Sequence, residues 1–415
     1  MRSLTLSATA MAAVLGAILS AGAAHAGCGI EAGSVRILAN DFDALRTVIT
    51  EAEQCAGDGV QVTANLTTEH KVLQVPALTT NPAQYTVAMI SNNSIAPLLA
   101  QDLVRPLDDL VAEHGSQLME SQLIRVDGQI VAIAFMVNGQ NLFLRGDVLE
   151  EAGVEPPASM EGMLEAAEAI RAQGIMQYPL AAAYQSGWYL ANEFVNTYLG
   201  LGGQFFEEGS AAPAVNGPEG IRTLELMKAM SDYMQPEYLT VGADEMKAMY
   251  LSGNVAMMNQ WASMVSGHID PEGPAPEIGE ATLLAPAPTA DGGSIPASAL
   301  WWDGFSIATN ISDQDAEASF IALMHGIRPE MAQQNPTAAA WLIEGFTAPE
   351  TAQAILETGQ MGAQAYPMVP YMGLLHTALG AELAEFMQGR ESAEDALRDV
   401  EAAYTTAARE SGFLN

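Results

Sequence analysis

The sequence predicts an α/β protein divided into two lobes, and three observations lead to this fold class. The chain has 415 residues, which is too long for one ordinary core and suggests two or three domains. Short apolar stretches alternate with helical patterns over residues 35–123, as expected for a lobe with a mostly parallel sheet. The apolar extended stretch within residues 126–153 is interrupted by Asn138-Gly139-Gln140-Asn141. A core strand has no reason to contain this interruption, so we expect the chain to pass there from one lobe to the other.

The composition describes a well-packed protein with a strongly acidic surface. Hydrophobic residues make up 49% of the chain and charged residues 16%, which is typical of a folded soluble protein. The 50 Asp and Glu residues against 15 Lys and Arg residues give a formal net charge of -35. This charge argues strongly against nucleic acid or an anionic lipid surface as a partner, and it fits a solvated surface in a salty medium.

The first 26 residues have the features of an export signal. Arg2 is followed by an apolar stretch over residues 4–23, and Ala24-His25-Ala26 forms a small-x-small cleavage site. An uncleaved anchor is one alternative. A lipoprotein modified at Cys28 is another, but His25 occupies a position where that signal needs an aliphatic residue. No later stretch is long and apolar enough to span a bilayer, so we expect a soluble mature protein.

The first expected strand and helix, residues 35–39 and 42–54, bring the two cysteines together. About seven strand residues at about 3.3 Å each and about thirteen helical residues at about 1.5 Å each cover similar lengths. The end of the helix therefore returns beside the start of the strand, where Cys55 and Cys28 lie. In an oxidising compartment we expect a structural disulfide between them; two free thiols are the alternative.

Polar residues follow two of the strands expected in the first half of the chain. In open α/β sheets, ligands bind beyond the carboxyl ends of the strands. Asn40, Asp41 and Phe42 follow the first strand, and Asn92 follows the strand over residues 85–90. These residues are therefore candidates for a ligand site, although their positions fit capping of the next helices equally well.

The second half of the chain alternates helical stretches with aromatic segments. We expect helices over residues 159–174, 221–234 and 244–251, and from residue 312 towards the carboxyl terminus, with surface connections around one short strand over residues 271–296. Ser159, Ser312 and Ser392 have the side-chain type of helix N-caps.

Several motifs in this order resemble bacterial extracellular solute-binding proteins of the sugar-binding family, the soluble receptors of ABC importers. The motifs occur along most of the chain. They comprise a Pro-Leu-Asp-x-Leu stretch at residues 106–110, a strand opened by Asp127-Gly128, the charged pair Arg145 and Asp147, a helix ended by Gly153, the Pro156-Pro157 pair before Ser159, a strand ending in Trp261 and a Trp-containing turn before the strand at residues 300–308.

The resemblance implies the two-lobe periplasmic-binding-protein fold, with a cleft and three hinge crossings. We expect the crossings near residues 137–139, 262–266 and 324–328. The first lobe would then contain residues 27–137 and 265–325, and the second lobe residues 138–264 and 326–415, after a signal peptide of residues 1–26.

The resemblance also implies aromatic residues in the cleft. In that family the loop here spanning Tyr184 and Trp188 places an aromatic ring in the sugar site, and the strand end at Trp261 lies in the cleft. Two adjacent Trp residues of a strand point to opposite sides, and we favour Trp302, with Asp303 beside it as an acceptor. Core packing is the alternative for each ring. The expected ligand-binding residues are Asn40, Asp41, Phe42, Asn92, Asn138, Tyr184, Trp188, Trp261, Trp302, Asp303 and Tyr371.

These residue types suit a neutral carbohydrate, meaning a sugar, oligosaccharide or polyol. Aromatic faces cover the C–H side of a sugar, and amides or carboxylates bind its hydroxyls. No Arg or Lys lies in the candidate motifs, which disfavours an anionic ligand. A cationic solute such as a polyamine is the alternative, because Trp302 and Asp303 would also suit a cation. We expect a monomer in the periplasm that delivers its ligand to an inner-membrane ABC permease.

Motif searches exclude several enzyme classes. The chain contains no Gly-Lys pair for a phosphate-binding loop, no His-Glu-x-x-His zinc motif and no Gly-x-Ser-x-Gly elbow. The six His residues are scattered, so the two Cys residues belong to no zinc-site spacing. We therefore expect no enzyme activity, catalytic residue, metal or cofactor. A carbohydrate hydrolase with a carboxylate pair stays open, as does a surface adhesin without a closing cleft.

Overall fold

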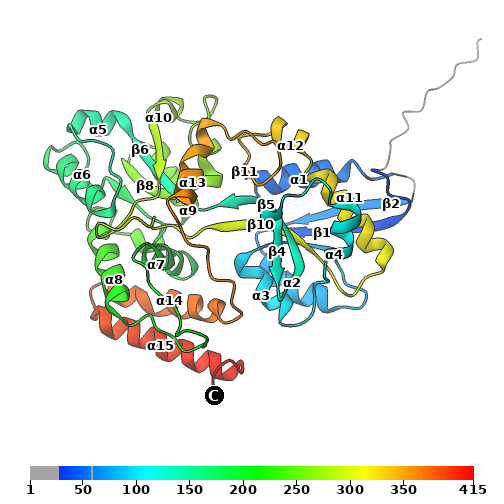
Figure 1. The fold of residues 1–415 in the computed structure, drawn as a ribbon. Helices are drawn as coiled ribbons and strands as arrows, with labels where there is room; N and C mark the ends of the chain where they lie inside the picture. Colours follow the sequence, from blue (N-terminus) through cyan, green and yellow to red (C-terminus); the bar gives the residue numbers. More distant parts are fainter. Residues whose placement is uncertain (1–27, 58) are drawn as a thin grey trace, which may run out of the picture.

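The computed structural model describes residues 28–57 and 59–415, and it contains two β-sheets that lie in separate halves of the molecule (Figure 1). We call each sheet with its covering helices a lobe. The export signal expected at residues 1–26 lies outside the described residues. Among the described helices, none has the length and apolarity needed to cross a membrane.

The first lobe contains a seven-stranded sheet in the order β11-β5-β10-β3-β1-β2, with β4 paired to β5. The expected strands near residues 35–39 and 85–90 are present, and β1 pairs in parallel with both β2 and β3, but β10 runs antiparallel to both β3 and β5. The sheet is therefore mixed, not mostly parallel, because strands from later in the chain enter its centre. Its strands are β1 (Gly33–Ala39), β2 (Val60–Leu66), β3 (Val87–Ser91), β4 (Leu123–Val126), β5 (Gln129–Asn138), β10 (Trp301–Ile307) and β11 (Ala340–Trp341).

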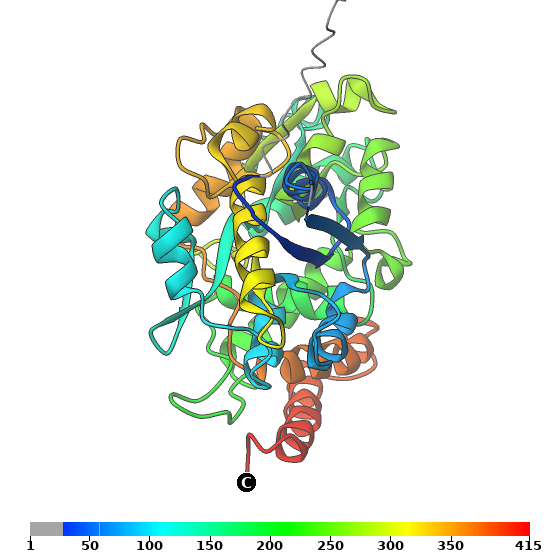
Figure 2. The ribbon, with the colours of Figure 1, turned by 90° about the vertical axis from the view of Figure 1, so that its right-hand side faces the viewer.

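Five helices of the first lobe, α1, α2, α3, α11 and α12, bury apolar residues against this sheet or against one another. α1 buries Ala44, Leu45, Val48, Ile49 and Ala52, a helical spacing that places them on one face. α1 packs against α11, which crosses the front of the lobe in Figure 2. The helices are α1 (Asp43–Glu53), α2 (His70–Thr79), α3 (Asn92–Leu99), α4 (Asp108–His114), η1 (Glu120–Gln122), α11 (Asp313–Gly326) and α12 (Pro329–Gln334).

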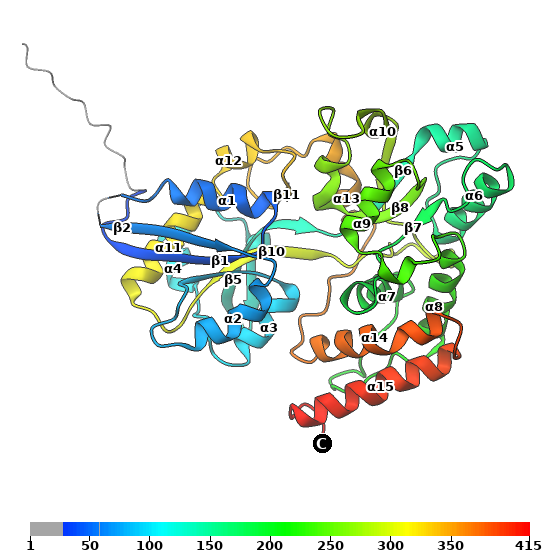
Figure 3. The ribbon, with the colours of Figure 1, turned by 180° about the vertical axis from the view of Figure 1, so that it is seen from behind.

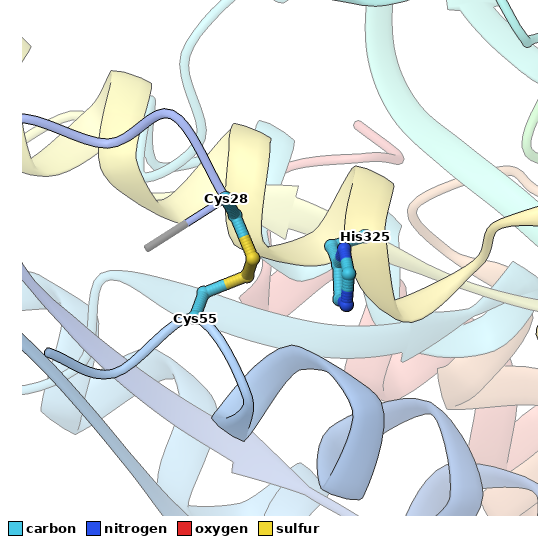
Figure 4. A group of neighbouring side chains, drawn as sticks. All are labelled: Cys28, Cys55 and His325. Carbon is cyan, nitrogen blue, oxygen red and sulfur yellow. A yellow bond between two sulfur atoms is a disulfide. The ribbon is translucent and has the colours of Figure 1, made fainter. Parts of the chain in front are cut away.

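The expected disulfide is confirmed. Cys28 precedes β1 and Cys55 follows α1, and their sulfur atoms are bonded with the Cα atoms 5.1 Å apart. Figure 4 shows the imidazole of His325, from α11, beside the bond. Because each sulfur is bonded to the other, this group offers no thiolate to a metal ion.

The second lobe contains a four-stranded sheet in the order β7-β8-β6-β9. Its strands are β6 (Gln140–Arg145), β7 (Leu180–Ala181), β8 (Met257–Trp261) and β9 (Thr282–Pro286). The helices are α5 (Gly146–Ala152), α6 (Met160–Ala172), α7 (Trp188–Gly200), α8 (Pro218–Ser231), η2 (Tyr238–Thr240), α9 (Ala243–Leu251), η3 (Ala262–Gly267), α10 (Pro276–Glu280), α13 (Glu350–Gln360), α14 (Met372–Met387) and α15 (Ala393–Glu410).

The expected serine caps hold these helices at their amino ends. Ser159, Ser312 and Ser392 each accept a hydrogen bond from the backbone N–H three residues later, at the starts of α6, α11 and α15. α14 and α15 then lie side by side along the outside of the second lobe, as Figure 3 shows.

The strand pairing differs from the expected lobe boundaries in two places. Residues 265–325 were expected in the first lobe, but β9 pairs with β6 in the second. Residues 326–415 were expected in the second lobe, but β11 pairs with β5 in the first. The chain therefore changes lobes between β9 and β10 and between β11 and α13, not near residues 262–266 and 324–328. The boundaries had been placed at local breaks in the sequence pattern, which do not reveal the hydrogen-bonding partner of a short strand.

The first passage between the lobes occurs at the polar interruption of the sequence. β5 ends at Asn138 and β6 begins at Gln140, so Gly139 is the linking residue. A Cβ atom on Gly139 would lie 2.9 Å from Cδ1 of Ile355, 3.1 Å from Oγ of Ser298 and 3.2 Å from the carbonyl oxygen of Ala299. The absence of a side chain thus lets the first passage pack against the second, at residues 298–299.

Replacing Cys28 and Cys55 by Ser should lower the stability of the first lobe. The bond closes a loop with a sequence separation of 27, and loop-closure entropy assigns such a loop about 3.5 kcal/mol. Thermal unfolding of the oxidised protein and of the double variant would measure this difference. Equal midpoints for the two proteins would contradict the expectation, and the variant with added reductant is the control.

Candidate ligand-binding site

A cleft of about 340 Å³ lies between the two lobes and is lined by both. The first lobe contributes the ends of β1 and β3, the start of α2 and the start of β10. The second contributes the starts of α7 and α9, the end of β8 and the residues of η3. The lining residues are Asn40, Asp41, Phe42, Thr68, Lys71, Ser91, Asn138, Trp188, Tyr189, Ala243, Asp244, Trp261, Ser263, Met264, Trp301 and Asp303.

A larger cavity, of about 550 Å³, lies between α10, β9 and α13. Its lining contains no aromatic ring and no cationic side chain. The smaller cleft is the better candidate for a site, because it combines aromatic, amide and charged side chains from two lobes.

Three tryptophan rings form an aromatic surface in the cleft. The ring centroids of Trp188 and Trp261 are 6.4 Å apart with planes inclined by 27°. Trp301 lies 6.1 Å from the first ring and 6.0 Å from the second. The Trp188 side chain is 39% exposed, which is unusual for a ring of this size and leaves an apolar face available to a ligand.

Buried residues of the second lobe hold Trp188 in position. Its carbonyl oxygen lies 3.0 Å from Nε2 of His376, whose Nδ1 lies 3.1 Å from the hydroxyl of Tyr366. Burial lowers the pKa of His376 to about 4, so the imidazole is neutral at neutral pH. Nε2 therefore donates to the carbonyl oxygen, and Nδ1 accepts from the tyrosine hydroxyl. Tyr366 also stacks on Trp301 with ring centroids 4.3 Å apart. The buried pair of His376 and Tyr366 therefore supports both Trp188 and Trp301.

Lys71 and Asp303 are the charged residues next to these rings. Nζ of Lys71 lies 5.7 Å from the ring centre of Trp188 and 5.9 Å from that of Trp301. Desolvation raises the pKa of Asp303 to about 6, against the attraction of Lys71. Desolvation also lowers the pKa of Lys71, against the attraction of Asp303. Because Lys71 keeps an exposed surface and Asp303 is only half-buried, the cleft walls cause this desolvation and a ligand can still reach both groups.

Comparison with known proteins gives the family of the chain. The model of the bacterial extracellular solute-binding protein family matches residues 53–335. The chain belongs to this family. No curated protein matches the sequence of this solute-binding protein.

Solved structures share the two-lobe fold of this solute-binding protein. An ABC transporter solute-binding protein of Agrobacterium radiobacter, in complex with ribitol, is 18% identical with a TM-score of 0.77, over 90% of this chain and 98% of that chain. A maltose-bound protein of T. maritima is 17% identical with a TM-score of 0.77, over 91% and 100% of the two chains. An Agrobacterium vitis protein with bound D-mannitol is 18% identical with a TM-score of 0.74, over 92% and 100%. At these identities the likeness establishes the periplasmic-binding-protein fold of the chain.

Most of the residues expected in the site of this solute-binding protein line its cleft. They come from the end of β1, from the first passage, from α7, from the end of β8 and from β10. Those in the cleft are Asn40, Asp41, Phe42, Asn138, Trp188, Trp261 and Asp303.

Asn92 and Trp302 lie outside the cleft and are structural. The side-chain amide of Asn92 donates to the carbonyl oxygen of Leu300 at 3.0 Å and accepts from the N–H of Trp302 at 2.9 Å, so it joins α3 to β10. Both rings are buried: the Trp302 ring packs in the core of the first lobe, whereas the Trp301 ring, 5% exposed, packs in the core of the second lobe and lines the cleft. Strand alternation requires one ring on each side, and the expectation chose the wrong one.

Tyr184 and Tyr371 also lie outside the cleft, in the second lobe. Tyr184 is buried in the core and packs edge-on against Tyr238 at 6.3 Å. The Tyr371 hydroxyl donates to the carbonyl oxygen of Ser210 at 3.2 Å, and its ring meets Phe206 edge-on at 4.7 Å. Both tyrosines pack within the lobe, which is the alternative that composition alone could not exclude.

The expectations missed Lys71 and Trp301 among the lining residues. Lys71 follows β2 by a few residues, so the rule that nominated residues after β1 and β3 would have found it if applied to β2 as well. Trp301 could not be separated from Trp302 by the sequence pattern, because both neighbours have the same chemistry.

A buried polar network connects the cleft wall to the two passages. The side-chain amide of Gln140 donates to Glu193 at 2.6 Å and accepts from Asn196 at 3.0 Å and from Asn259 at 2.8 Å. Asn196 accepts from the N–H of Ala299 at 2.9 Å. The start of β6, α7, β8 and the second passage are thereby held together. Burial raises the pKa of Glu193 to about 7, with its hydrogen bonds opposing the shift.

The stability of the Glu193→Gln variant relative to the unsubstituted protein should rise between pH 5 and pH 8. The folded protein holds the Glu193 proton up to a pKa of about 7, against 4.5 as the ordinary value, so stability falls as the pH rises between these values. The full penalty, present above about pH 7, is of the order of 3 kcal/mol. Urea unfolding at pH 5 and pH 8 would measure it. Exposed Glu344, changed to Gln, is the control, and the same change in stability between pH 5 and pH 8 in Glu193→Gln and in the unsubstituted protein would contradict this assignment.

Proposed function

We propose that this protein is the substrate-binding component of an ABC importer and binds a neutral carbohydrate in the periplasm. The cleft carries this proposal, because it joins the exposed ring of Trp188 and the partly exposed ring of Trp261 to hydrogen-bonding groups from both lobes. Rings of this kind cover the C–H face of a sugar or polyol, while amide, hydroxyl, ammonium and carboxylate groups bind its hydroxyls. Lys71 corrects the expectation that the site contains no cation, and it disfavours a polyamine by charge repulsion.

The ligands of the structural neighbours support the same chemical class. The three proteins described above are bound to ribitol, maltose and D-mannitol. All three compounds are uncharged and rich in hydroxyl groups. They support the same class of solute for this chain.

In the proposed mechanism, the lobes close around the solute by bending at the passages between them. Contacts from both lobes favour the closed form over the open one, and an inner-membrane ABC permease recognises the closed form. Gly139 and residues 298–299 lie together at two passages, so they are the proposed hinge. The protein would act as a monomer and reach the periplasm by means of the export signal at residues 1–26.

Calorimetric titration with sugars and polyols, ribitol, D-mannitol and maltose included, tests the proposed function. Small-angle scattering of the same mixtures should show compaction on binding. A hydrolase would convert a bound glycoside, whereas a binding protein releases it unchanged, so mass spectrometry after incubation separates these functions. Absence of binding by every member of the panel would contradict the proposal.

The Trp261→Ala variant should bind the carbohydrate found in this panel about 10- to 100-fold more weakly, which corresponds to about 1.4 to 2.8 kcal/mol. Its ring lines the cleft and is only partly buried, so its loss removes ligand contact and leaves the fold intact. Calorimetry would give the affinity, and circular dichroism the fold. Tyr371→Phe is the control, because that ring packs against Phe206 outside the cleft. Wild-type affinity in Trp261→Ala would remove this residue from the site.

A further inference from the structure

We propose that Lys71 is the specificity-determining residue that keeps cationic solutes out of a cleft otherwise suited to them. This inference rests on the proposed function and narrows it, because it assigns the selection of neutral over aminated carbohydrates to one side chain. The groups that carry it are the ammonium of Lys71, the tryptophan rings beneath it and the carboxylates around it.

Without Lys71, the cleft would have the composition of a cation site. Three tryptophan rings line it, and aromatic faces attract ammonium groups. Asp303 and Asp244 line it as well, from β10 and from the start of α9. Among the lining residues Lys71 is the single cationic side chain. Its position over the rings of Trp188 and Trp301, at 5.7 and 5.9 Å, is the one that a ligand's amine would take.

Lys71 and Asp303 are both available to a ligand. Among the described residues, neither side chain forms a hydrogen bond or an ion pair within 4.0 Å, whereas Asp41 accepts from Arg46 at 2.7 Å. Burial shifts the pKa of each group towards its neutral form, as expected for charged groups that lack a hydrogen-bonding partner. A hydroxyl group can accept from Lys71 and donate to Asp303, and so it satisfies both.

The backbone of β10 fixes Asp303 and Trp301 on the same side of the sheet. They are two residues apart in the strand, and Trp302 between them points into the core. The pairing of β10 with β5 shifts register just after Asp303, and a side chain on Gly304 would collide with the carbonyl oxygen of Ile133. The acceptor is thus held by the sheet, while the flexible stem of Lys71 can move with the solute.

The charge of the solute then determines whether it binds in the cleft. An amine would have to displace or approach the ammonium of Lys71 between the cleft walls, where like charges repel more strongly than in bulk water. A carboxylate would face Asp303 and Asp244. A neutral polyol meets neither repulsion, so it is the solute that this arrangement admits.

The test compares D-glucitol with 1-amino-1-deoxy-D-glucitol. The second compound carries an ammonium group at neutral pH in place of one hydroxyl group of the first. Calorimetry should show that the wild-type protein prefers D-glucitol. In Lys71→Met the affinity ratio should move at least 10-fold towards the amine, and Lys71→Gln should move it in the same direction. Lys71→Arg, which keeps the positive charge, should retain the wild-type preference.

Lys228→Met is the matched control, since the Lys228 ammonium lies 5.9 Å from the ring of Tyr238 outside the cleft. An unchanged ratio in folded Lys71→Met and Lys71→Gln would overturn the inference. If the wild-type protein binds neither compound, a gain of amine binding in Lys71→Met supports the inference, and its absence overturns it. The proposed function is judged separately, by the wider sugar panel.

Discussion

The buried hydrogen bonds of Gln140 are the constraint on which the arrangement of this molecule depends. Gln140 is the first residue of β6, directly after the passage from the first lobe, and its side chain reaches α7 and β8. Its N–H also donates to Oγ of Ser298 in the second passage, at 2.8 Å. A hydrogen bond of this kind contributes about 1 kcal/mol, but an unsatisfied buried partner costs about 1–3 kcal/mol. The hydrogen bonds of this network therefore stabilise one another. They connect the two passages to α7, the helix that begins with Trp188.

The cleft depends on this connection between the two passages, because each lobe supplies a different part of the cleft lining. The first lobe brings the polar residues after β1 and Ser91 at the end of β3, together with Lys71 at the start of α2. The second lobe brings Trp188 and Trp261, and Trp301 lies where β10 begins after the second passage. A solute that contacts the rings and the polar groups at once must touch both lobes. Its binding energy therefore depends on their mutual angle, which is the requirement for closure driven by a ligand.

The presence of Lys71 in the cleft is notable because the chain has few cationic residues. The chain has 15 Lys and Arg residues against 50 Asp and Glu residues. Several of the arginines form ion pairs on the surface, among them Arg222 with Asp291 at 2.7 Å and Arg105 with Asp313 at 3.1 Å. Such exposed pairs contribute little to stability. A lysine directed into the ligand cleft of such an acidic protein, without an ion-pair partner among the described residues, is best explained by the solute that the cleft selects.

The sequence by itself determined the α/β class, the first strands and helices, the disulfide and the place where β5 gives way to β6. These features depend on local patterns: apolar periodicity, serine caps, the spacing of two cysteines and a polar break in an apolar stretch. It also nominated seven of the sixteen residues that line the cleft. Three of them follow the carboxyl end of β1, which is recognisable from the strand itself, and the others came from the polar break and from the family resemblance.

Only the tertiary structure decided which lobe contains β9 and β11 and which of two adjacent tryptophans lines the cleft. It also decided that the Lys71 ammonium lies close to the tryptophan rings. A strand of two to five residues carries no record of its partner, since the hydrogen bonds that place it are made by backbone groups that every residue has. The face on which a side chain emerges depends on the register of that pairing, and one residue of register moves each ring to the opposite side.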